Sequence, residues 1–319
     1  MKNEEKYKNL IKVSKLYYYG HLNQQQIADL MDTSRSTIAR MLMEAERKKI
    51  VRIEINDKYF DYDLAAQALM EAYDLKFVEI VPSSANIAST KISIGNVATD
   101  YLNRFITETS VIGISWGTTV SSFVSAYQPF KKFPHAKVVQ IVGGVYNSAS
   151  HMDGRDLARR LAGKLGCDFA ALQAPIFVSN PELRELFLEE EDTKAHFELM
   201  KQLDIAIISI GSSDYSESNI YKAKYVDEET AKQLYSGGLC DVCGHQIDMY
   251  GNEPENNLSK RLIGISLEDL KNTPMVIGMC AGNNRTAPIL SSINGGYIKG
   301  LIIDEVAAIP LLQAEGIEL

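Results

Sequence analysis

The sequence has few cysteines, a single tryptophan and no long apolar run. Two of its four cysteines, Cys240 and Cys243, form a Cys-x-x-Cys pair, and His245 follows closely. A structural zinc site needs four ligands, usually with a second pair at similar spacing, and the sequence has no such pair. We therefore predict no metal site and expect the cysteines to be reduced and partly buried.

No apolar stretch approaches the length of a membrane span, and the first residues, MKNEEKYKNL, do not have the pattern of a signal peptide. These two absences predict a cytoplasmic protein with no membrane partner. A chain of 319 residues is long enough for two or three domains.

The formal charge of −8 is unevenly distributed. Residues 1–55 contain eleven Lys and Arg against seven Asp and Glu, a charge of +4, so the remainder carries −12. A basic head on an acidic body is typical of a protein that contacts nucleic acid at one end.

Residues 24–42, QQQIADLMDTSRSTIARML, predict two short helices joined by a tight turn. Asn23 can cap the first helix, whose inward positions we predict to be Ile27, Ala28, Leu30 and Met31. The turn is 32–34, and Asp is among the few residues other than Gly that tolerate a positive φ there. The second helix is predicted over 35–45, with its apolar positions on one face.

The outward face of this pair carries short hydroxyls, amides and guanidinium groups, which reach base edges and phosphates in a major groove. The alternative is an ordinary helical hairpin whose polar residues face solvent. The alternating residues 50–55, which resemble the wing of a winged helix, favour DNA binding. The predicted DNA-binding residues are Gln24, Gln25, Ser34, Arg35, Ser36, Thr37 and Arg40.

The pattern divides the chain into a winged helix-turn-helix domain at 1–56, a linker helix at 57–75 and a body at 76–319. Uninterrupted apolar runs in the body indicate strands covered on both faces, as in a mostly parallel α/β sheet with flanking helices. Strands are predicted over 77–81, 111–114, 138–142, 205–210, 262–265, 275–279 and 297–303.

In a doubly wound sheet, ligands bind beyond the carboxyl ends of the strands. Ser115, Gly117, Thr118 and Thr119 follow one predicted strand and open a helix, so Gly, two hydroxyls and free backbone N–H groups could together hold a phosphate. The alternative is an ordinary helix start with Thr as the N-cap.

Five further residues lie near predicted strand ends: Arg285, Asp304, Asp241, Arg261 and Gln140. Arg285 could bind the same phosphate with two N–H groups, or lie in solvent. Asp304 could accept hydrogen bonds from sugar hydroxyls, or cap a helix. Asp241 and Arg261 are candidates of the same type. Gln140 could line the same cleft or pair with sheet backbone.

The chain resembles the SorC family of bacterial sugar-responsive transcription regulators, which includes deoxyribonucleoside and central-glycolysis repressors. The likeness covers about residues 5–313. It is carried by the helix pair at 24–42 and by Gly113–Thr119, Val139–Gly144, Leu172–Pro175, Asp241–Gly244, Ala281–Gly282 and Asp304–Glu305.

This resemblance implies a winged-helix head and a Rossmann-like body related to sugar-phosphate isomerases and deaminases. It implies a phosphorylated sugar as effector, with its phosphate at Gly117, Thr118 and Thr119. Arg285 stands where the family commonly has Lys, and Cys240 where it often has Gly. The resemblance also implies a homodimer or homotetramer that the effector releases from DNA.

We therefore predict a regulator, acting as a repressor, that binds double-stranded operator DNA under the control of a sugar phosphate. No cofactor and no catalytic residue is predicted. The acidic and basic residues of the body show no arrangement beyond what hydrogen bonding to sugar hydroxyls would need. The alternative is a sugar-phosphate isomerase or deaminase that carries a DNA-binding head.

Overall fold

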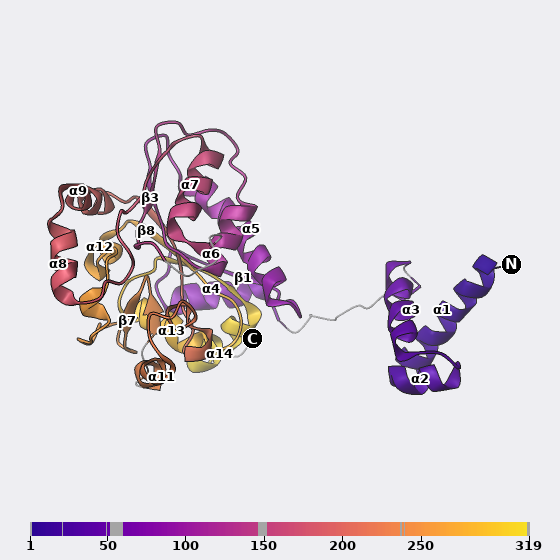
Figure 1. The fold of residues 1–319 in the computed structure, drawn as a ribbon. Coiled ribbons are helices and arrows are strands. Elements are labelled where there is room, and N and C mark those ends of the chain that lie inside the picture. The colour runs from indigo at the N-terminus through magenta and orange to yellow at the C-terminus, as the bar shows by residue number, and fades with distance from the viewer. Residues whose placement is uncertain are drawn as a thin grey trace. The chain divides into compact units, whose positions relative to one another are not determined.

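The computed structural model describes residues 2–20, 22–48, 50–51, 60–145, 152–236, 238 and 240–317. The chain divides into two compact units, residues 1–59 and 60–319 (Figure 1). Each unit has a hydrophobic core of its own.

The first unit contains three helices: α1 (Lys2–Tyr18), α2 (Gln24–Leu30) and α3 (Arg35–Arg47). Its core is formed by Val13, Ile27, Ala28, Ile38 and Leu42. This core confirms the predicted inward positions of the two short helices, except at Leu30. The Leu30 side chain is 66% exposed, because α2 has only seven residues and Leu30 ends it on the side away from the core.

Local capping explains why α2 and α3 begin where they do. The Asn23 side chain accepts hydrogen bonds from the N–H groups of Gln25 and Gln26, and the Gln26 side chain accepts one from the Asn23 N–H, which completes a capping box. Asp32 in the turn has a φ of 47°, as predicted. Ser34 then caps α3 through its bond from the Thr37 N–H.

Of the predicted wing strand at 50–55, Ile50 and Val51 lie in a bend, and residues 52–55 lie outside the described residues. The same holds for the predicted boundary at 56–58.

The second unit alternates helices and strands. Its elements are α4 (Tyr62–Ala72), β1 (Phe77–Val81), α5 (Ile87–Phe105), β2 (Val111–Ile114), α6 (Thr118–Ala126), β3 (Lys137–Gln140), α7 (Gly154–Leu165), β4 (Asp168–Ala170), α8 (Pro181–Glu189), α9 (Glu191–Met200), β5 (Ile205–Ser209), η2 (Tyr215–Glu217), α10 (Asn219–Lys222), α11 (Glu228–Ser236), β6 (Cys240–Val242), β7 (His245–Ile247), η3 (Ser259–Arg261), α12 (Leu267–Asn272), β8 (Met275–Met279), α13 (Thr286–Asn294), β9 (Gly300–Asp304) and α14 (Glu305–Ala314).

Seven of these strands form one sheet in the order β1-β9-β8-β5-β2-β3-β4, and all of its pairs are parallel. Helices α5, α6 and α7 cover one face, and α4, α9, α12, α13 and α14 cover the other (Figure 1). The sheet confirms the predicted parallel α/β body.

The strands are apolar throughout because alternate residues enter the two cores. In β5, Ile205 and Ile207 pack with α5, α6 and α7, whereas Ala206 and Ile208 pack on the opposite face. All four side chains are buried, which explains the uninterrupted apolar run.

Two parts of the body differ from the prediction. Residues 262–265 form no strand of the sheet and make only the isolated bridges Phe177–Leu262 and Val142–Gly264. The hairpin of β6 and β7 was not predicted. Its turn residues Cys243 and Gly244 have φ values of 55° and 91°, as a type I′ turn requires, but Cys replaces the usual Asn or Asp.

None of the helices in the described part of the chain is long and apolar enough to cross a membrane.

Candidate functional site

The first candidate surface is the exposed face of α3. Ser36, Arg40, Met43 and Arg47 recur at the spacing of one helix face, and all four are exposed. The opposite face of α3 is buried through Ile38, Leu42 and Ala45. Packing of that face against α1 and α2 thus fixes which residues α3 presents to solvent.

Three of the predicted DNA-binding residues lie close together at the start of α3. The Ser34 hydroxyl lies 2.9 Å from that of Ser36 and 2.8 Å from that of Thr37. Arg35 and Arg40 are exposed. On α2, Gln24 is half-buried, and Gln25 donates a hydrogen bond to Asp29.

The second candidate site is a cavity of about 670 Å³ in the second unit. It lies beyond the carboxyl ends of β2, β5 and β8, which are neighbours in the sheet. Helix α5, the segment 217–223, α11 and the β6–β7 hairpin supply the remaining walls. Its volume is within the ~300–1,000 Å³ usual for small-molecule sites.

The start of α6 forms one wall of the cavity through Thr118 and Thr119. Gly117 is the N-cap residue, with a φ of 113°, and no side chain caps the helix. The alternative in which Thr is the N-cap is therefore not what the structure shows. Because the first N–H groups of a helix have no partner within it, this end of α6 can hold an anion.

Gly117 also allows this wall to be built. A side chain there would be strained by its φ, and its Cβ would come within 3.0 Å of the Ser209 hydroxyl. Gly117 itself adjoins the cavity rather than lining it.

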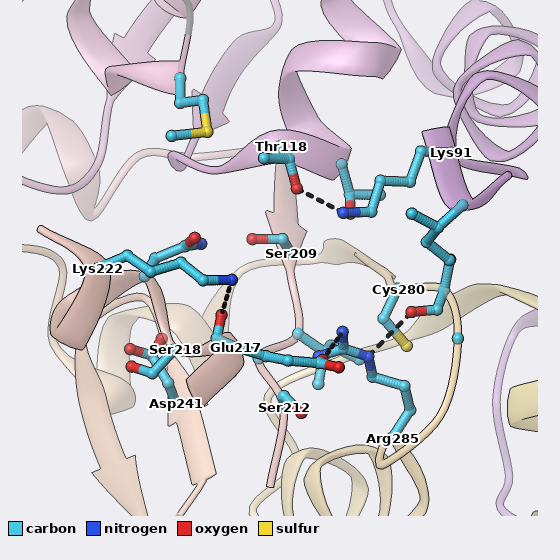
Figure 2. Close-up of a pocket in the computed structure, with 18 of the residues that line it drawn as sticks. Lys91, Thr118, Ser209, Ser212, Glu217, Ser218, Lys222, Asp241, Cys280 and Arg285 are labelled. Atoms are coloured by element: carbon cyan, nitrogen blue, oxygen red, sulfur yellow. Dashed lines mark hydrogen bonds and ion pairs between the residues drawn. The ribbon is translucent and has the colours of Figure 1, made fainter. Parts of the chain in front are cut away.

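Three cations face the cavity from different elements: Lys91 of α5, Lys222 of α10, and Arg285 before α13 (Figure 2). The Lys91 ammonium donates a hydrogen bond of 2.7 Å to the Thr118 hydroxyl. Burial lowers the pKa of Lys91 below 10.5, and the charges of Arg285 and Lys222 lower it further. An anion bound among the three would relieve this repulsion.

Arg285 and Lys222 both contact Glu217. The Arg285 guanidinium lies 2.8 Å from the Glu217 carboxylate and also donates to the Ala281 carbonyl. The Lys222 ammonium donates to the backbone carbonyl of Glu217, at 3.1 Å.

Asp241 lines the opposite side of the cavity, near Ser218 (Figure 2). Its Oδ1 accepts a long hydrogen bond, 3.4 Å, from the Gly244 N–H. Its Oδ2 is buried and has no hydrogen-bond partner. A buried carboxylate oxygen without a partner suits a ligand hydroxyl, which would donate to it.

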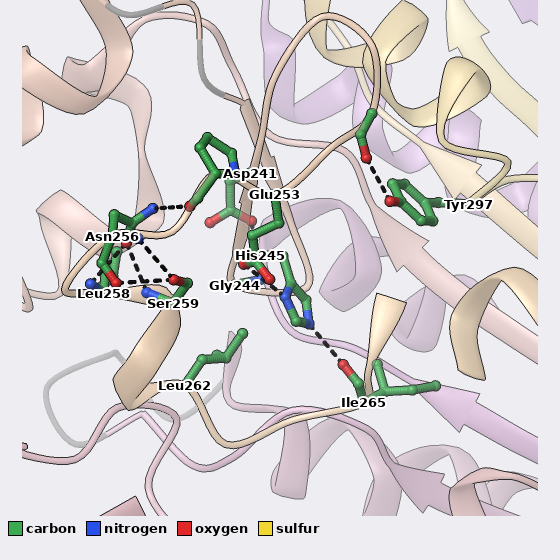
Figure 3. A network of polar contacts seen from close by, with 12 residues as sticks. Asp241, Gly244, His245, Glu253, Asn256, Leu258, Ser259, Leu262, Ile265 and Tyr297 are labelled. Carbon is green, nitrogen blue, oxygen red and sulfur yellow. Dashed lines mark hydrogen bonds and ion pairs between the residues drawn. The ribbon is translucent and has the colours of Figure 1, made fainter. Parts of the chain in front are cut away.

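The β6–β7 hairpin that carries Asp241 is held in place by His245 (Figure 3). One ring nitrogen of His245 lies 2.9 Å from the Glu253 carboxylate, and the other lies 2.8 Å from the Ile265 carbonyl. These two contacts join β7 to Glu253 and to the backbone at Ile265.

Burial raises the pKa of Asp241 from 3.8 to about 6. Because this pKa is higher in the folded chain, folding favours the protonated carboxyl, and the free energy of unfolding falls as pH rises through about 4 to 6. Asp241→Asn cannot ionise, so we expect it to unfold with a free energy on the order of 2–3 kcal/mol higher than wild type at pH 7.5 and nearly equal at pH 3.5.

Urea denaturation of the ligand-free protein checks this, with the fluorescence of Trp116 as readout. Trp116 is the single tryptophan, is 4% exposed and belongs to the second unit. Asp168→Asn, which changes an exposed carboxylate, is the control and should differ little from wild type at either pH. A gain in stability that does not depend on pH would contradict the account.

Four of the predicted effector-binding residues are brought together at the cavity: Thr118, Thr119, Asp241 and Arg285. Five others do not line it: Ser115, Gly117, Gln140, Arg261 and Asp304. Ser115 is buried behind the wall and accepts a hydrogen bond from the Ser209 N–H. The Gln140 side chain donates a hydrogen bond to the Val142 carbonyl and accepts one from the Leu172 N–H. It therefore pairs with backbone, as the second of the two alternatives for Gln140 proposed.

Arg261 and Asp304 are likewise engaged elsewhere. The Arg261 guanidinium donates to the backbone carbonyls of Asn257 and Val178. Asp304 caps α14 and accepts hydrogen bonds from the Ser83 hydroxyl and the Gly282 N–H. Asp304 therefore supports the loop after β8 without reaching the cavity.

Several residues that line the cavity were not predicted from the sequence. Ser209 and Ser212 stand at and just after the end of β5, so the rule of searching strand ends could have found them. Lys91 lies in the second turn of α5, and Lys222 in a four-residue helix between β5 and β6. Nothing local marks either lysine, because the fold alone brings them to the cavity.

The Cys-x-x-Cys pair forms no metal centre with His245, whose two nitrogens contact Glu253 and Ile265. Burial raises the pKa of Cys240, Cys243 and Cys280. Within the ranges that the structure describes, no group of three or more His, Cys, Asp and Glu residues is placed to hold a metal ion.

Comparison with known proteins gives consistent matches over nearly the whole chain. A family model described as "Putative sugar-binding domain" matches residues 57–313. The chain is 27% identical to the deoxyribonucleoside regulator of Bacillus subtilis strain 168 over 312 residues, which cover 98% of this chain and 99% of that protein. It is 25% identical to the sorbitol operon regulator of Klebsiella pneumoniae over 315 residues, which cover 98% and 100%.

The fold agrees with these matches. The crystal structure of the full-length sorbitol operon regulator from Klebsiella pneumoniae superposes with a TM-score of 0.74 and 26% identity, covering 96% of this chain and 98% of that one. A transcriptional regulator from Streptococcus pneumoniae TIGR4 gives a TM-score of 0.73 at 25% identity, covering 80% and 98%.

Proposed function

Since the chain belongs to the sugar-binding-domain family of SorC-type transcription regulators, we propose that it is a DNA-binding regulator of a carbohydrate or nucleoside operon. Its affinity for DNA is controlled by a phosphorylated sugar bound in the cavity of the second unit. Two of the relatives named above are a deoxyribonucleoside regulator and a sorbitol operon regulator.

The observation that carries the proposal is the charge of the cavity. Lys91, Lys222 and Arg285 converge beside the uncapped start of α6, and Glu217 and Asp241 are the carboxylates among the described lining residues. Burial, and then repulsion by Arg285 and Lys222, lower the pKa of Lys91, and a bound anion would relieve the repulsion. A phosphate there would accept hydrogen bonds from two ammonium groups, a guanidinium and backbone N–H groups.

Asp241 supports the sugar part of the ligand. Its unpartnered Oδ2 can accept a hydrogen bond from a hydroxyl, and a second phosphate beside this carboxylate would be repelled. The ligand we propose is thus a phosphate monoester of a polyhydroxylated carbon chain, with its phosphate at α6 and a hydroxyl at Asp241.

The first unit is proposed to bind operator DNA as a winged helix-turn-helix, with α3 as the recognition helix. Its exposed face carries Ser36 and Arg40, and the hydroxyls of Ser34 and Thr37 lie at its start. A homodimer or homotetramer would present two such heads to a palindromic site, with half-sites about 34–36 Å apart or at multiples of that spacing.

The regulatory mechanism proposed is linkage between the two ligands. If the effector binds one arrangement of the subunits better than another, it shifts the population of head spacings, and DNA affinity changes with it. By reciprocity, operator DNA must change the affinity for the effector by the same factor.

A thermal-shift screen against a panel of sugar phosphates and their unphosphorylated parents tests the effector. A ligand that binds the native state raises the melting temperature by mass action. We expect a rise with a phosphorylated sugar and none with its parent. No rise with any member of a panel of pentose and hexose phosphates would count against a sugar phosphate in this cavity.

The same screen separates the regulator from the alternative, an isomerase or deaminase. Any ligand that raises the melting temperature is incubated with the protein and followed by NMR. A regulator leaves the ligand unchanged, whereas sustained conversion would favour the enzyme.

A further inference from the structure

The Glu217 carboxylate lies where an anionic ligand of the cavity would have to bind. Glu217 ends η2, and its Oε2 lies 2.8 Å from the Arg285 guanidinium. The same residue offers its backbone carbonyl to the Lys222 ammonium, at 3.1 Å. One short turn of the chain therefore supplies oxygen atoms to two of the three cavity cations (Figure 2).

The third cation lacks such a partner. Lys91 donates a hydrogen bond to the neutral Thr118 hydroxyl. The negative charge of Glu217 raises the pKa of Lys91, but this effect is smaller than the lowering by burial and by the charges of Arg285 and Lys222. Glu217 thus neutralises only part of the positive charge of the three cations, and a dianion at the same position would neutralise more of it.

The Glu217 side chain is exposed enough to move away from Arg285 into solvent. Its side chain is 40% exposed, whereas that of Arg285 is 13% exposed. Arg285 is also held by the Ala281 carbonyl, so the guanidinium stays at the cavity when the ion pair opens. The carboxylate can turn into solvent at little cost, since a partly exposed ion pair contributes little stability.

Glu217 also belongs to a segment that the ion pair helps to hold. The Ser213 N–H and hydroxyl both donate to the Asn284 carbonyl, next to Arg285, at 3.1 and 3.3 Å. Beyond Glu217, α10 has four residues, and Ser218 at its start and Lys222 at its end both line the cavity. Release of Glu217 would therefore loosen one wall.

We propose that Glu217 is an internal competitor of the ligand phosphate: its carboxylate pairs with Arg285 in the empty cavity, and the phosphate must displace it to bind. This inference rests on the proposed function and adds the event that binding triggers in the protein. It also predicts selectivity, because a dianionic phosphate gains more from the three cations than a monoanionic carboxylate does.

The test compares Glu217→Gln with wild type by calorimetric titration of the full chain with inorganic phosphate. Inorganic phosphate lacks sugar hydroxyls, so it reports the anion position alone. Loss of the competing charge should tighten phosphate binding roughly five- to tenfold. Glu229→Gln is the matched control: it makes the same change at an exposed residue of α11 that does not line the cavity, and should bind phosphate as wild type does.

The direction of the change decides the matter. If Glu217 merely positions Arg285 for the ligand, Glu217→Gln will bind phosphate equally or more weakly than wild type, and the inference is wrong while the phosphate site stands. If neither wild type, Glu217→Gln nor Glu229→Gln binds phosphate, the proposed phosphate position fails together with the inference.

Discussion

Arg285→Ala is expected to bind the phosphorylated sugar roughly 10- to 150-fold more weakly than wild type, a loss of about 1.5–3 kcal/mol. The guanidinium is largely buried at the cavity and donates to Glu217 in the ligand-free protein, so its N–H groups are already aimed at the anion position. Removing it takes away charge-assisted hydrogen bonds that a phosphate would otherwise accept. Calorimetric titration with the sugar phosphate identified by the thermal-shift screen measures the loss.

Arg261→Ala is the matched control for this prediction. It also removes an Arg side chain that was predicted from the sequence to bind the effector. In the structure, however, the Arg261 guanidinium donates hydrogen bonds to the carbonyls of Asn257 and Val178. We expect effector affinity to be unchanged in Arg261→Ala. A similar loss in both variants would show that stability rather than direct contact is responsible, and unchanged affinity in Arg285→Ala would place the phosphate elsewhere.

The second large effect is expected at the surface of α3. Arg40→Ala should weaken binding to a selected operator duplex by about 1–3 kcal/mol and leave effector binding intact. Arg40 is exposed in the middle of α3, and Ser36 lies one turn before it on the same face. Arg159→Ala, which removes an exposed Arg of the second unit, should bind the operator as wild type does.

The dependence of the affinity loss on DNA sequence and on salt shows whether Arg40 contacts a base or a phosphate. If it contacts a base, the ratio of specific to non-specific binding falls. If it contacts a phosphate, all duplexes lose affinity alike and the dependence of binding on salt becomes weaker. Fluorescence anisotropy at two salt concentrations measures both, and equal operator affinity in wild type and Arg40→Ala would remove Arg40 from the recognition surface.

The features that could be predicted from sequence are those with local causes. The start of α2 follows from Asn23 and Gln26, three residues apart, and the turn before α3 follows from the tolerance of Asp32 for a positive φ. The sheet was predictable because buried parallel strands are apolar on both faces, as in β5.

The errors arose where local pattern does not determine pairing. Residues 262–265 are apolar and buried like a strand, but only two bridges join them to Phe177 and Val142. The pattern of apolar residues predicts which side chains are buried, but it does not predict which segment of backbone pairs with them. The β6–β7 hairpin was missed because Cys243 occupies a turn position where Asn or Asp would have indicated it.

The candidate site was predictable only in part for the same reason. Thr118 and Arg285 follow strands directly, so topology places them at the edge where ligands bind. Asp304 is the last residue of β9, but its carboxylate caps α14 and accepts a hydrogen bond from the Gly282 N–H. Lys91 and Lys222 reach the cavity from within helices, and no rule about strand ends applies to them.

The most direct test of the central claim is the affinity of the full chain for a duplex selected from a random DNA pool, measured by fluorescence anisotropy with and without the sugar phosphate. We expect at least a tenfold change in affinity with the sugar phosphate, a coupling free energy of about 1.4 kcal/mol, and no change with the unphosphorylated parent. Equal operator affinity with the cavity saturated and empty would rule out control of DNA binding by the sugar phosphate.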